Sequence, residues 1–188
     1  MRKFTTMAGL LCAALTMSSS AFAQAPAQAP APAAPAPASA NPNDAVPDAM
    51  PFDVPYGETI NLETAKKVAA AAMAEATKHN WKLCIAVVGP TGDLVYFERM
   101  DNCQYASISI SQHKARAAAK YRRPTLAFEN AMGRGSNFSY LSTLDDIVAS
   151  RGGNPLVVGG KLIGAIGVSG GTGSQDDVVS QAGVAAIK

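Results

Sequence analysis

Apolar residues recur every three or four positions over residues 61–79, which predicts an amphipathic helix there. Thr59 or Asn61 stands where the start of this helix needs a capping side chain. The pattern then changes to a continuous apolar run over residues 82–88, followed by a Pro-Thr-Gly-Asp turn and a second apolar segment over residues 94–100. These two segments predict a β-hairpin that follows the helix.

The middle of the chain returns to helical spacing. Residues 105–121 predict a second long helix. Pro124 suits the first position of a further short helix, and Gly133 suits its end. Residues 134–150 have no clear period, and we expect a loop there with a short helix around residues 144–149.

The C-terminal part repeats the order of hairpin and helix. Residues 155–158 and 161–168 flank a Gly-Gly pair and predict a second hairpin. A Gly-rich turn over residues 169–173 leads into a final helix over residues 175–187, for which Ser174 is the expected cap. Because the strands come in hairpin pairs separated by helices, the sheet should be antiparallel with helices packed on it, in a single domain of the α+β class.

The first part of the chain has a different composition. Residues 1–23 combine an Arg-Lys start, a short apolar stretch and a final Ala-Phe-Ala, which is typical of a cleavable signal peptide. Residues 24–51 are mostly Ala and Pro, and because Pro lacks an amide donor and has a fixed φ, we expect a disordered, semi-extended linker. The folded domain should therefore occupy residues 52–188, and the protein should be periplasmic or secreted.

The whole-chain charge of +2 depends on the predicted signal peptide. Loss of Arg2 and Lys3 lowers the basic residues from 16 to 14, which equals the 14 acidic residues. A neutral chain has no bulk attraction for nucleic acid, so we expect no nucleic-acid partner. No apolar run reaches the roughly 20 residues of a membrane span, so we expect no span either.

Cys84 and Cys103 are the cysteines outside the predicted signal peptide, and an oxidising compartment would permit a disulfide between them. In the predicted hairpin, however, Cys84 lies opposite Arg99. The four-residue offset to Cys103 corresponds to about 13 Å at the rise of a strand, whereas a disulfide spans about 7 Å between Cα atoms. The register argues mildly against the bond, although a bend in the chain would bring the two cysteines together.

The predicted helix over residues 105–121 carries a polar stripe. At about 100° per residue, Ser109, His113, Arg116 and Lys120 fall on one narrow side of this helix. A neutral imidazole is a common ligand of haem iron, and guanidinium and ammonium groups suit the haem propionates. On spacing alone, a solvated polar face is the more common explanation of such a stripe.

Two residues at the end of the second predicted strand are weaker candidates. Met100 could supply a soft axial ligand but is more typical of core packing. Asp101 could bind a ligand but more commonly caps the next helix. The Gly-rich segment over residues 169–177 lacks the Gly-Lys-Ser/Thr ending of a phosphate loop, and its two aspartates would repel phosphate. We therefore interpret that segment as a tight connection between strand and helix.

Several short motifs occur in a characteristic order: Gly89–Val95, Arg99–Asp101, Lys114–Ala119 with Arg123–Thr125, Gly152–Pro155, Gly160–Gly171, Gln175–Asp176 and Ala182–Gly183. In this order and spacing they resemble the GlcG/HbpS family, whose fold also forms the C-terminal domain of PduO-type proteins. The resemblance spans about residues 58–188 and implies a profilin-like antiparallel sheet flanked by helices, assembled as a homo-oligomer. It also implies an association with haem.

With this resemblance, our first hypothesis is an exported protein that binds haem or another tetrapyrrole. His113 is then the candidate iron ligand, and Arg116 and Lys120 are the candidates for propionate contacts. Tyr105 and Met100 are lesser candidates for binding the cofactor.

Two further hypotheses stay open. One is a small-molecule enzyme (haem-degrading, lyase or isomerase) with a pocket between the sheet and the 105–121 helix, in which Asp101 and His113 are the catalytic acid/base candidates. The other is a non-catalytic oligomeric accessory module. The sequence does not rank these two.

Overall fold

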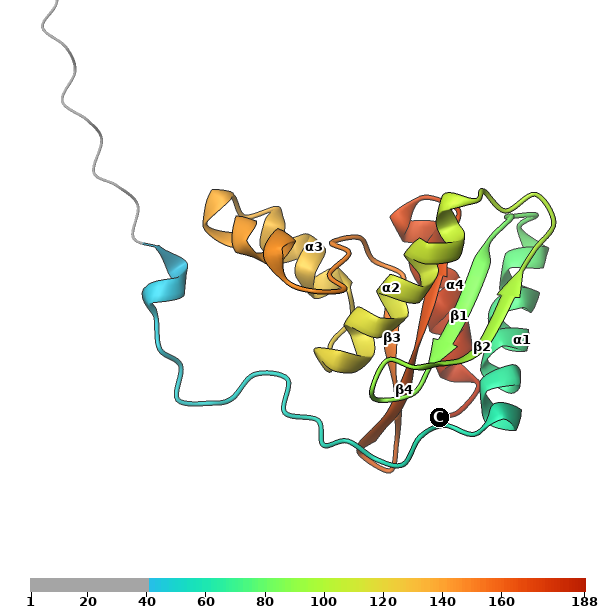
Figure 1. The fold of residues 1–188 in the computed structure, drawn as a ribbon, viewed down its shortest axis with the longest axis horizontal. Helices are drawn as coiled ribbons and strands as arrows, with labels where there is room; N and C mark the ends of the chain where they lie inside the picture. The colour runs from blue at the N-terminus through green and yellow to red at the C-terminus, as the bar shows by residue number, and fades with distance from the viewer. Residues whose placement is uncertain (1–40) are drawn as a thin grey trace, which may run out of the picture. The chain divides into compact units, whose positions relative to one another are not determined.

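The sheet has four antiparallel strands in the order β2-β1-β4-β3 (Figure 1). Their bounds are Cys84–Val88 for β1, Leu94–Arg99 for β2, Gly153–Val158 for β3 and Lys161–Ser169 for β4. Both predicted hairpins are present, and they join through β1 and β4 in the centre of the sheet. The structure is a computed structural model that describes residues 41–188. The predicted signal peptide and residues 24–40 of the predicted linker lie outside the described residues.

Helices cover both faces of this sheet. On one face α1 (Leu62–Lys78) packs beside α4 (Gly173–Ala185), and on the other face α2 (Ala106–Lys120) lies across β4 and β1 (Figure 1). The short helix α3 (Leu126–Met132) and the 3-10 helix η2 (Ser136–Thr143) form a lobe that packs against the C-terminal half of α2. The predicted α+β fold with one antiparallel sheet is confirmed. None of the described helices is both long and apolar enough to cross a bilayer.

The segment before α1 is attached to the sheet through β4. The Leu162 amide donates to the Pro55 carbonyl, and the Gly57 amide donates to the Leu162 carbonyl, both at 2.8 Å. Further upstream, residues 41–51 are exposed and contain a single 3-10 turn over Pro42–Asp44. The backbone hydrogen bonds between this segment and β4 therefore lie at Pro55 and Gly57.

The contact between α2 and the sheet is made by small residues. Ala115, Ala118 and Ala119 of the helix pack on Ala86 and Ala165 of the strands. A Cβ added at position 167 of β4, which is a glycine, would stand 2.5 Å from the backbone nitrogen of Ala115. The helix therefore rests directly on the sheet at these positions, which leaves no room there for the expected pocket between the sheet and the 105–121 helix.

The helix caps confirm one prediction and correct another. Asn61 caps α1, because its side chain accepts a hydrogen bond from the Thr64 amide at 2.8 Å. Ser174 does not cap α4: the cap is Thr172, whose hydroxyl accepts from the Gln175 amide at 3.3 Å. The Gln175 side chain accepts from the Thr172 amide at 2.8 Å, so the pair forms a reciprocal capping box.

The segment between α3 and β3 also differs from the prediction. Its helical turn is η2, over Ser136–Thr143, and residues 144–149 are not helical. Phe138 and Leu141 hold η2 in place because both are buried against Phe128 of α3. Asp146 has a φ of +63°, which is incompatible with a right-handed helix at that point.

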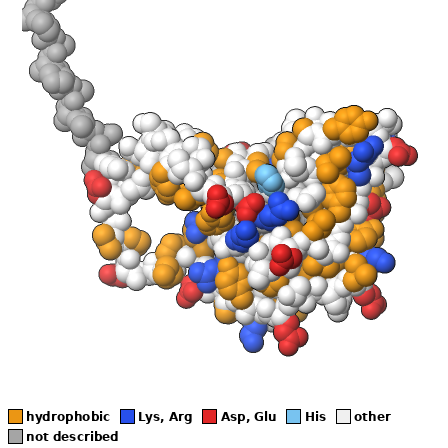
Figure 2. All heavy atoms as spheres, viewed as in Figure 1, with side chains coloured by type: hydrophobic (Ala, Val, Ile, Leu, Met, Phe, Trp, Pro, Cys, Tyr) orange, Lys and Arg blue, Asp and Glu red, His pale blue; other side chains and the backbone are white. Residues whose placement is uncertain are grey.

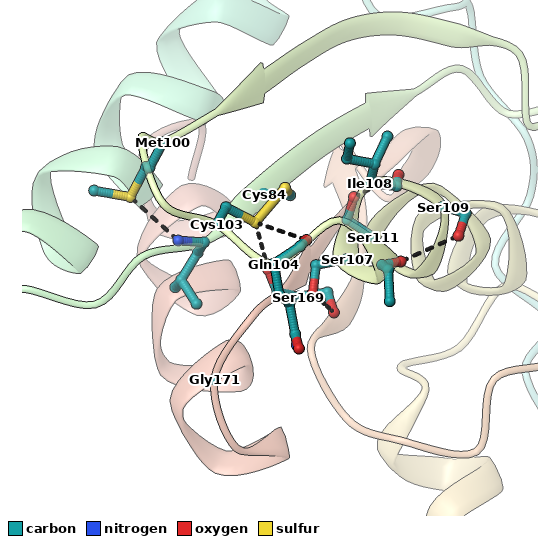
Figure 3. The surroundings of a disulfide bond; sticks show 12 residues. Cys84, Met100, Cys103, Gln104, Ser107, Ile108, Ser109, Ser111, Ser169 and Gly171 are labelled. Atoms are coloured by element: carbon teal, nitrogen blue, oxygen red, sulfur yellow. Dashed lines mark hydrogen bonds between the residues drawn. A yellow bond between two sulfur atoms is a disulfide. The ribbon is translucent and has the colours of Figure 1, made fainter.

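Cys84 and Cys103 form a disulfide, and their Cα atoms are 6.1 Å apart (Figure 3). The predicted register is confirmed, since Cys84 pairs with Arg99, and the bend that the sequence left open brings the two cysteines together. The chain does not continue as a strand after Arg99: Asn102 has a φ of +65°, and the Cys103 amide donates to the Met100 carbonyl at 3.1 Å. This turn brings Cys103 back to the start of β1.

Candidate functional site

The exposed side of α2 carries the predicted polar stripe. His113 is exposed, and its imidazole has no hydrogen bond or ion pair with any residue in the range 41–188. Ser109, one turn earlier, donates to the Ala106 carbonyl of its own helix at 3.1 Å. His113 is therefore the member of this stripe whose side chain is free to bind a ligand.

The two cations of the stripe share one carboxylate. Lys120 Nζ lies 2.7 Å from Asp146 Oδ2, and an Nη atom of Arg116 lies 4.0 Å from Asp146 Oδ1. Asp146 comes from the segment between η2 and β3, 26 residues after Lys120. Figure 2 shows basic and acidic side chains interleaved on the face of the molecule that carries α2. An anionic ligand at Arg116 and Lys120 would have to compete with Asp146.

Lys120 also borders a hollow of about 550 Å³, whose other lining residues are Tyr56, Gly57, Thr59, Pro90 and Thr91. The Tyr56 hydroxyl donates to the Lys120 carbonyl at 2.8 Å and so ties the hollow to the end of α2. Gly92, in the β1–β2 turn, makes room for the Lys120 side chain, because a Cβ there would stand 2.9 Å from Lys120 Cε. The polar stripe thus ends at an open cavity.

The lesser candidates do not join this site. The sulfur of Met100 accepts a hydrogen bond from the Leu83 amide at 3.5 Å (Figure 3). Met100 also packs against the core between the sheet and α1, which is the face opposite α2. Tyr105 lies just before α2 and is 79% exposed, with the Arg99 guanidinium 5.3 Å from its ring centroid. Met100 and His113 therefore lie on opposite faces of the sheet and would not bind the same iron.

Asp101 is also separate from the stripe. It is exposed in the turn after β2 and borders a hollow of about 370 Å³ together with Met73 of α1 and Met100. Within the described part of the chain, Asp101 and His113 share no hydrogen bond. The structure does not bring the two acid/base candidates together.

The sequence reasoning missed a buried ion pair between α2 and α4. Lys114 Nζ lies 2.7 Å from Asp176 Oδ2, and the two side chains are 2% and 3% exposed. Asp176 also accepts from the Gly171 amide at 3.0 Å. Burial raises the pKa of Asp176, and the charge of Lys114 opposes that rise. Gly152 permits this packing, since a Cβ there would stand 2.7 Å from Asp176 Cβ and 3.2 Å from Lys114 Nζ.

A signal for this pair was present in the helix pattern. Ser107, Ser111, Lys114 and Ala118 are spaced by four, three and four residues, so they share the side of α2 that faces the sheet. All four are buried. A lysine on a face of small residues requires a buried partner, because an unpaired charge in the interior is costly.

The side chains of the polar stripe suit a ligand whose metal is already coordinated mostly by the ligand itself. Within residues 41–188 no three His, Cys, Asp or Glu side chains lie together as a metal site. A single exposed imidazole can still occupy one open position of a metal whose other ligands belong to a macrocycle. Arg116 and Lys120 on the same stripe can face the acidic groups of such a ligand.

The fold places this chain in a class of small α+β domains whose antiparallel sheet is covered by helices on both faces. In this chain, one of those helices presents a free imidazole beside two cations. A family model described as "Haem degrading protein HbpS-like" matches residues 60–185. The chain therefore belongs to the HbpS-like family, and the predicted resemblance is confirmed.

Individual relatives agree with this assignment. The chain is 40% identical to Protein GlcG of Escherichia coli strain K12 over 110 residues, which are 58% of this chain and 81% of GlcG. The crystal structure of the Klebsiella pneumoniae protein ORFY matches with a TM-score of 0.67 and 29% identity, over 76% of this chain and 97% of ORFY. A structure of a PduOC:haem complex matches with a TM-score of 0.64 and 24% identity, over 69% and 96% of the two chains, and shares the fold.

Proposed function

We propose that this protein binds haem on the exposed side of α2, with His113 as the iron ligand. The observation that carries the proposal is the free, exposed imidazole of His113, placed on one stripe with two cationic side chains. The family model has haem in its description, and a protein of the same fold has been crystallised with haem. Both facts support haem as the ligand class.

The spacing along α2 suits this ligand. A rise of about 1.5 Å per residue places Arg116 about 4.5 Å and Lys120 about 10 Å from His113 along the helix axis. Haem is a flat apolar ring with iron at its centre and two propionates on one edge. An imidazole under the iron and cations further along the helix therefore match its two polar features.

Asp146 would compete with the haem propionates for Arg116 and Lys120. Its carboxylate already accepts from Lys120 and lies near Arg116. A propionate at these cations would displace it or share them with it. Removal of the Asp146 charge should therefore strengthen haem binding if the propionates lie where we propose.

The test is a haemin titration of the purified protein, followed through the Soret band. We expect a saturable, red-shifted band whose affinity falls in His113→Ala, because the iron loses its protein ligand. His79→Ala is the matched control: His79 is the other histidine of the chain, and it is engaged with Glu75 at 3.2 Å and stacked on Trp81 at 4.2 Å. Asp146→Asn should bind haemin more tightly than the parent protein.

Two results would reject the proposal. A linear, non-saturating response of the parent protein would mean that haem binds without a site. An unchanged affinity in His113→Ala, with the fold intact by circular dichroism, would remove the iron ligand from the stripe. A weaker affinity in His79→Ala alone would move the site to the C-terminal end of α1.

We favour binding over haem degradation as the activity of this site. In the described residues, no carboxylate or second imidazole hydrogen-bonds to His113, so the stripe has no acid/base partner beside its candidate ligand. Incubation of the haemin complex with a reductant tests the alternative. Release of iron with loss of the Soret band, at a rate that depends on His113, would make the protein an enzyme.

We further propose that the protein is exported. The signal-like composition of residues 1–23 supports this, and so does the Cys84–Cys103 disulfide, because disulfides persist in oxidising compartments. The test is the intact mass of the protein recovered from a bacterial periplasm. A mass that lacks residues 1–23 is the expected result, and recovery of the uncut chain from the cytoplasm would contradict it.

The predicted homo-oligomer is also a proposal, and it rests on the family resemblance. Light scattering on the purified protein measures the assembly directly. A mass equal to that of one chain, with haemin bound, would show that the site is complete within a single copy.

A further inference from the structure

A second hollow, of about 370 Å³, lies in the lobe that α3 and η2 form beside α2. It shares no lining residue with the hollow at Lys120. Its walls include four aromatic rings, from Phe52, Phe128, Phe138 and Tyr140, and two guanidinium groups, from Arg123 and Arg134. This combination of apolar walls with a few polar groups is typical of small-molecule sites, which usually measure about 300–1,000 Å³.

Arg123 lies near two aromatic rings. Its guanidinium carbon is 3.8 Å from the ring centroid of Phe52 and 5.5 Å from that of Phe128. Its Nε donates to the Tyr121 carbonyl at 2.9 Å. Contacts with the faces of a guanidinium leave its remaining N–H groups, which lie in its plane, available to donate. The aromatic rings therefore orient Arg123 without using its terminal donors.

Arg134 is the second cation of this hollow. Its guanidinium carbon is 5.9 Å from the ring centroid of Phe138, which is buried in η2. Arg134 lies just after the C-terminal end of α3, whereas Arg123 lies in the connection that precedes this helix. Segments at the two ends of α3 thus direct positive charge toward one cavity.

Within the part of the chain that the structure describes, Arg123 and Arg134 are not neutralised by a carboxylate. The lining of the hollow contains no Asp or Glu, and neither Arg123 nor Arg134 forms an ion pair with any residue between 41 and 188. The neighbouring arginines are paired: Arg122 with Asp53 at 3.4 Å and Arg151 with Glu129 at 2.6 Å. Arg123 is half-buried, and this burial lowers the pKa of its guanidinium. Among residues 41–188, the cations of this hollow therefore have no carboxylate partner.

We propose that this hollow binds a small aromatic carboxylate. The ring of the ligand would pack against Phe128, Phe138 and Tyr140, and its carboxylate would accept hydrogen bonds from Arg123 and Arg134. Planar guanidinium groups donate to a carboxylate in pairs, which gives this class of anion an advantage over halide ions. Phe52, from the segment before α1, closes the hollow over Arg123.

Calorimetric titration with trans-cinnamate tests the proposal, and cinnamamide is the neutral probe of the same shape. We expect saturable binding of cinnamate with a Kd below about 1 mM and binding of cinnamamide at least about tenfold weaker. Arg134→Gln should weaken cinnamate binding by about tenfold or more, because a charged donor is lost. Arg99→Gln is the matched control, since Arg99 also lies over an aromatic ring but is outside the hollow.

Three outcomes would overturn the proposal. The first is no saturable binding of cinnamate, benzoate or indole-3-acetate. The second is equal affinity for cinnamate and cinnamamide. The third is a cinnamate affinity that Arg134→Gln leaves unchanged, with the unfolding midpoint confirming that the variant is folded. Arg134 is exposed, so this variant should fold as the parent does.

The cinnamate titration tests this hollow independently of the haem proposal. Arg134→Gln should leave the haemin titration unchanged, and His113→Ala should leave cinnamate binding unchanged. If Arg134→Gln altered only the oligomeric state and not cinnamate binding, the hollow would be a contact between copies of the chain, and the proposed site would be wrong.

Discussion

Replacement of Lys114 by Met tests the buried ion pair that joins α2 to α4. The Lys114 and Asp176 side chains are 2% and 3% exposed, and their charged atoms are 2.7 Å apart. Lys114→Met fills a similar volume and leaves the Asp176 carboxylate buried without its cation. Removal of one partner of a buried pair typically costs about 3–5 kcal/mol. This is a large part of the roughly 5–15 kcal/mol that stabilises a domain.

The pH dependence of this loss identifies its cause. Burial already raises the pKa of Asp176 from its ordinary value of 3.8, and Lys114 opposes the rise, so Lys114→Met should raise that pKa further. Between the ordinary and the folded pKa, the native protein binds more protons than the unfolded chain, and stability falls as pH rises. The variant should therefore be closest to the parent in acid and furthest from it at neutral pH.

Urea unfolding followed by circular dichroism, without reductant, measures this at about pH 7 and about pH 5. The expected result is a lower midpoint with an unchanged slope, and a smaller difference from the parent at the lower pH. Lys78→Met is the matched control, because Lys78 is 67% exposed and its pair with Glu75 lies on the surface. Its midpoint should stay close to that of the parent.

A double variant separates the lost pairing from simple misfolding. Lys114→Met with Asp176→Leu removes both charges and should recover most of the lost stability, since apolar replacement of a buried pair is often neutral. If Lys114→Met were as stable as the parent at neutral pH, or if its loss were the same at both pH values, the reasoning about Asp176 would be refuted.

Three other predictions concern the disulfide, the helix–sheet contact and a surface pair. The double substitution Cys84→Ser with Cys103→Ser removes the disulfide, whose cysteines are separated by 19 in sequence. It should lower the free energy of unfolding in urea by about 3 kcal/mol, and a variant as stable as the parent would contradict this. Gly167→Ala meets the backbone of α2 and should cost about 1–3 kcal/mol or more in the same assay. The hydrogen bond from Arg151 lowers the pKa of Glu129 below 4.5. The pair therefore stabilises the fold above that pH, and this stabilisation is lost as the pH falls through the lowered pKa. Glu129→Gln should flatten this acid loss in a pH series.

The sequence by itself determined the long helices and the four strands of this fold, but not the position of η2. Helical spacing predicted α1 and α2 to within one or two residues, and the two hairpins follow from apolar runs separated by Gly-containing turns. These signals are local, because the period of apolar positions reflects which side of a helix or strand is buried. The family motifs, whose order is also a property of the chain, led to the same fold.

Only the tertiary structure decided which distant residues meet. The turn at Asn102 brings Cys103 to Cys84, the segment before β3 brings Asp146 to Lys120, and α4 brings Asp176 to Lys114. The partners in each pair are between 19 and 62 residues apart in sequence. Their meeting depends on the paths of the connecting loops and on how closely small residues let the helices approach the sheet. A local pattern predicts which side of an element is buried, whereas the partner on the other side of the interface is set by the packing of the whole domain.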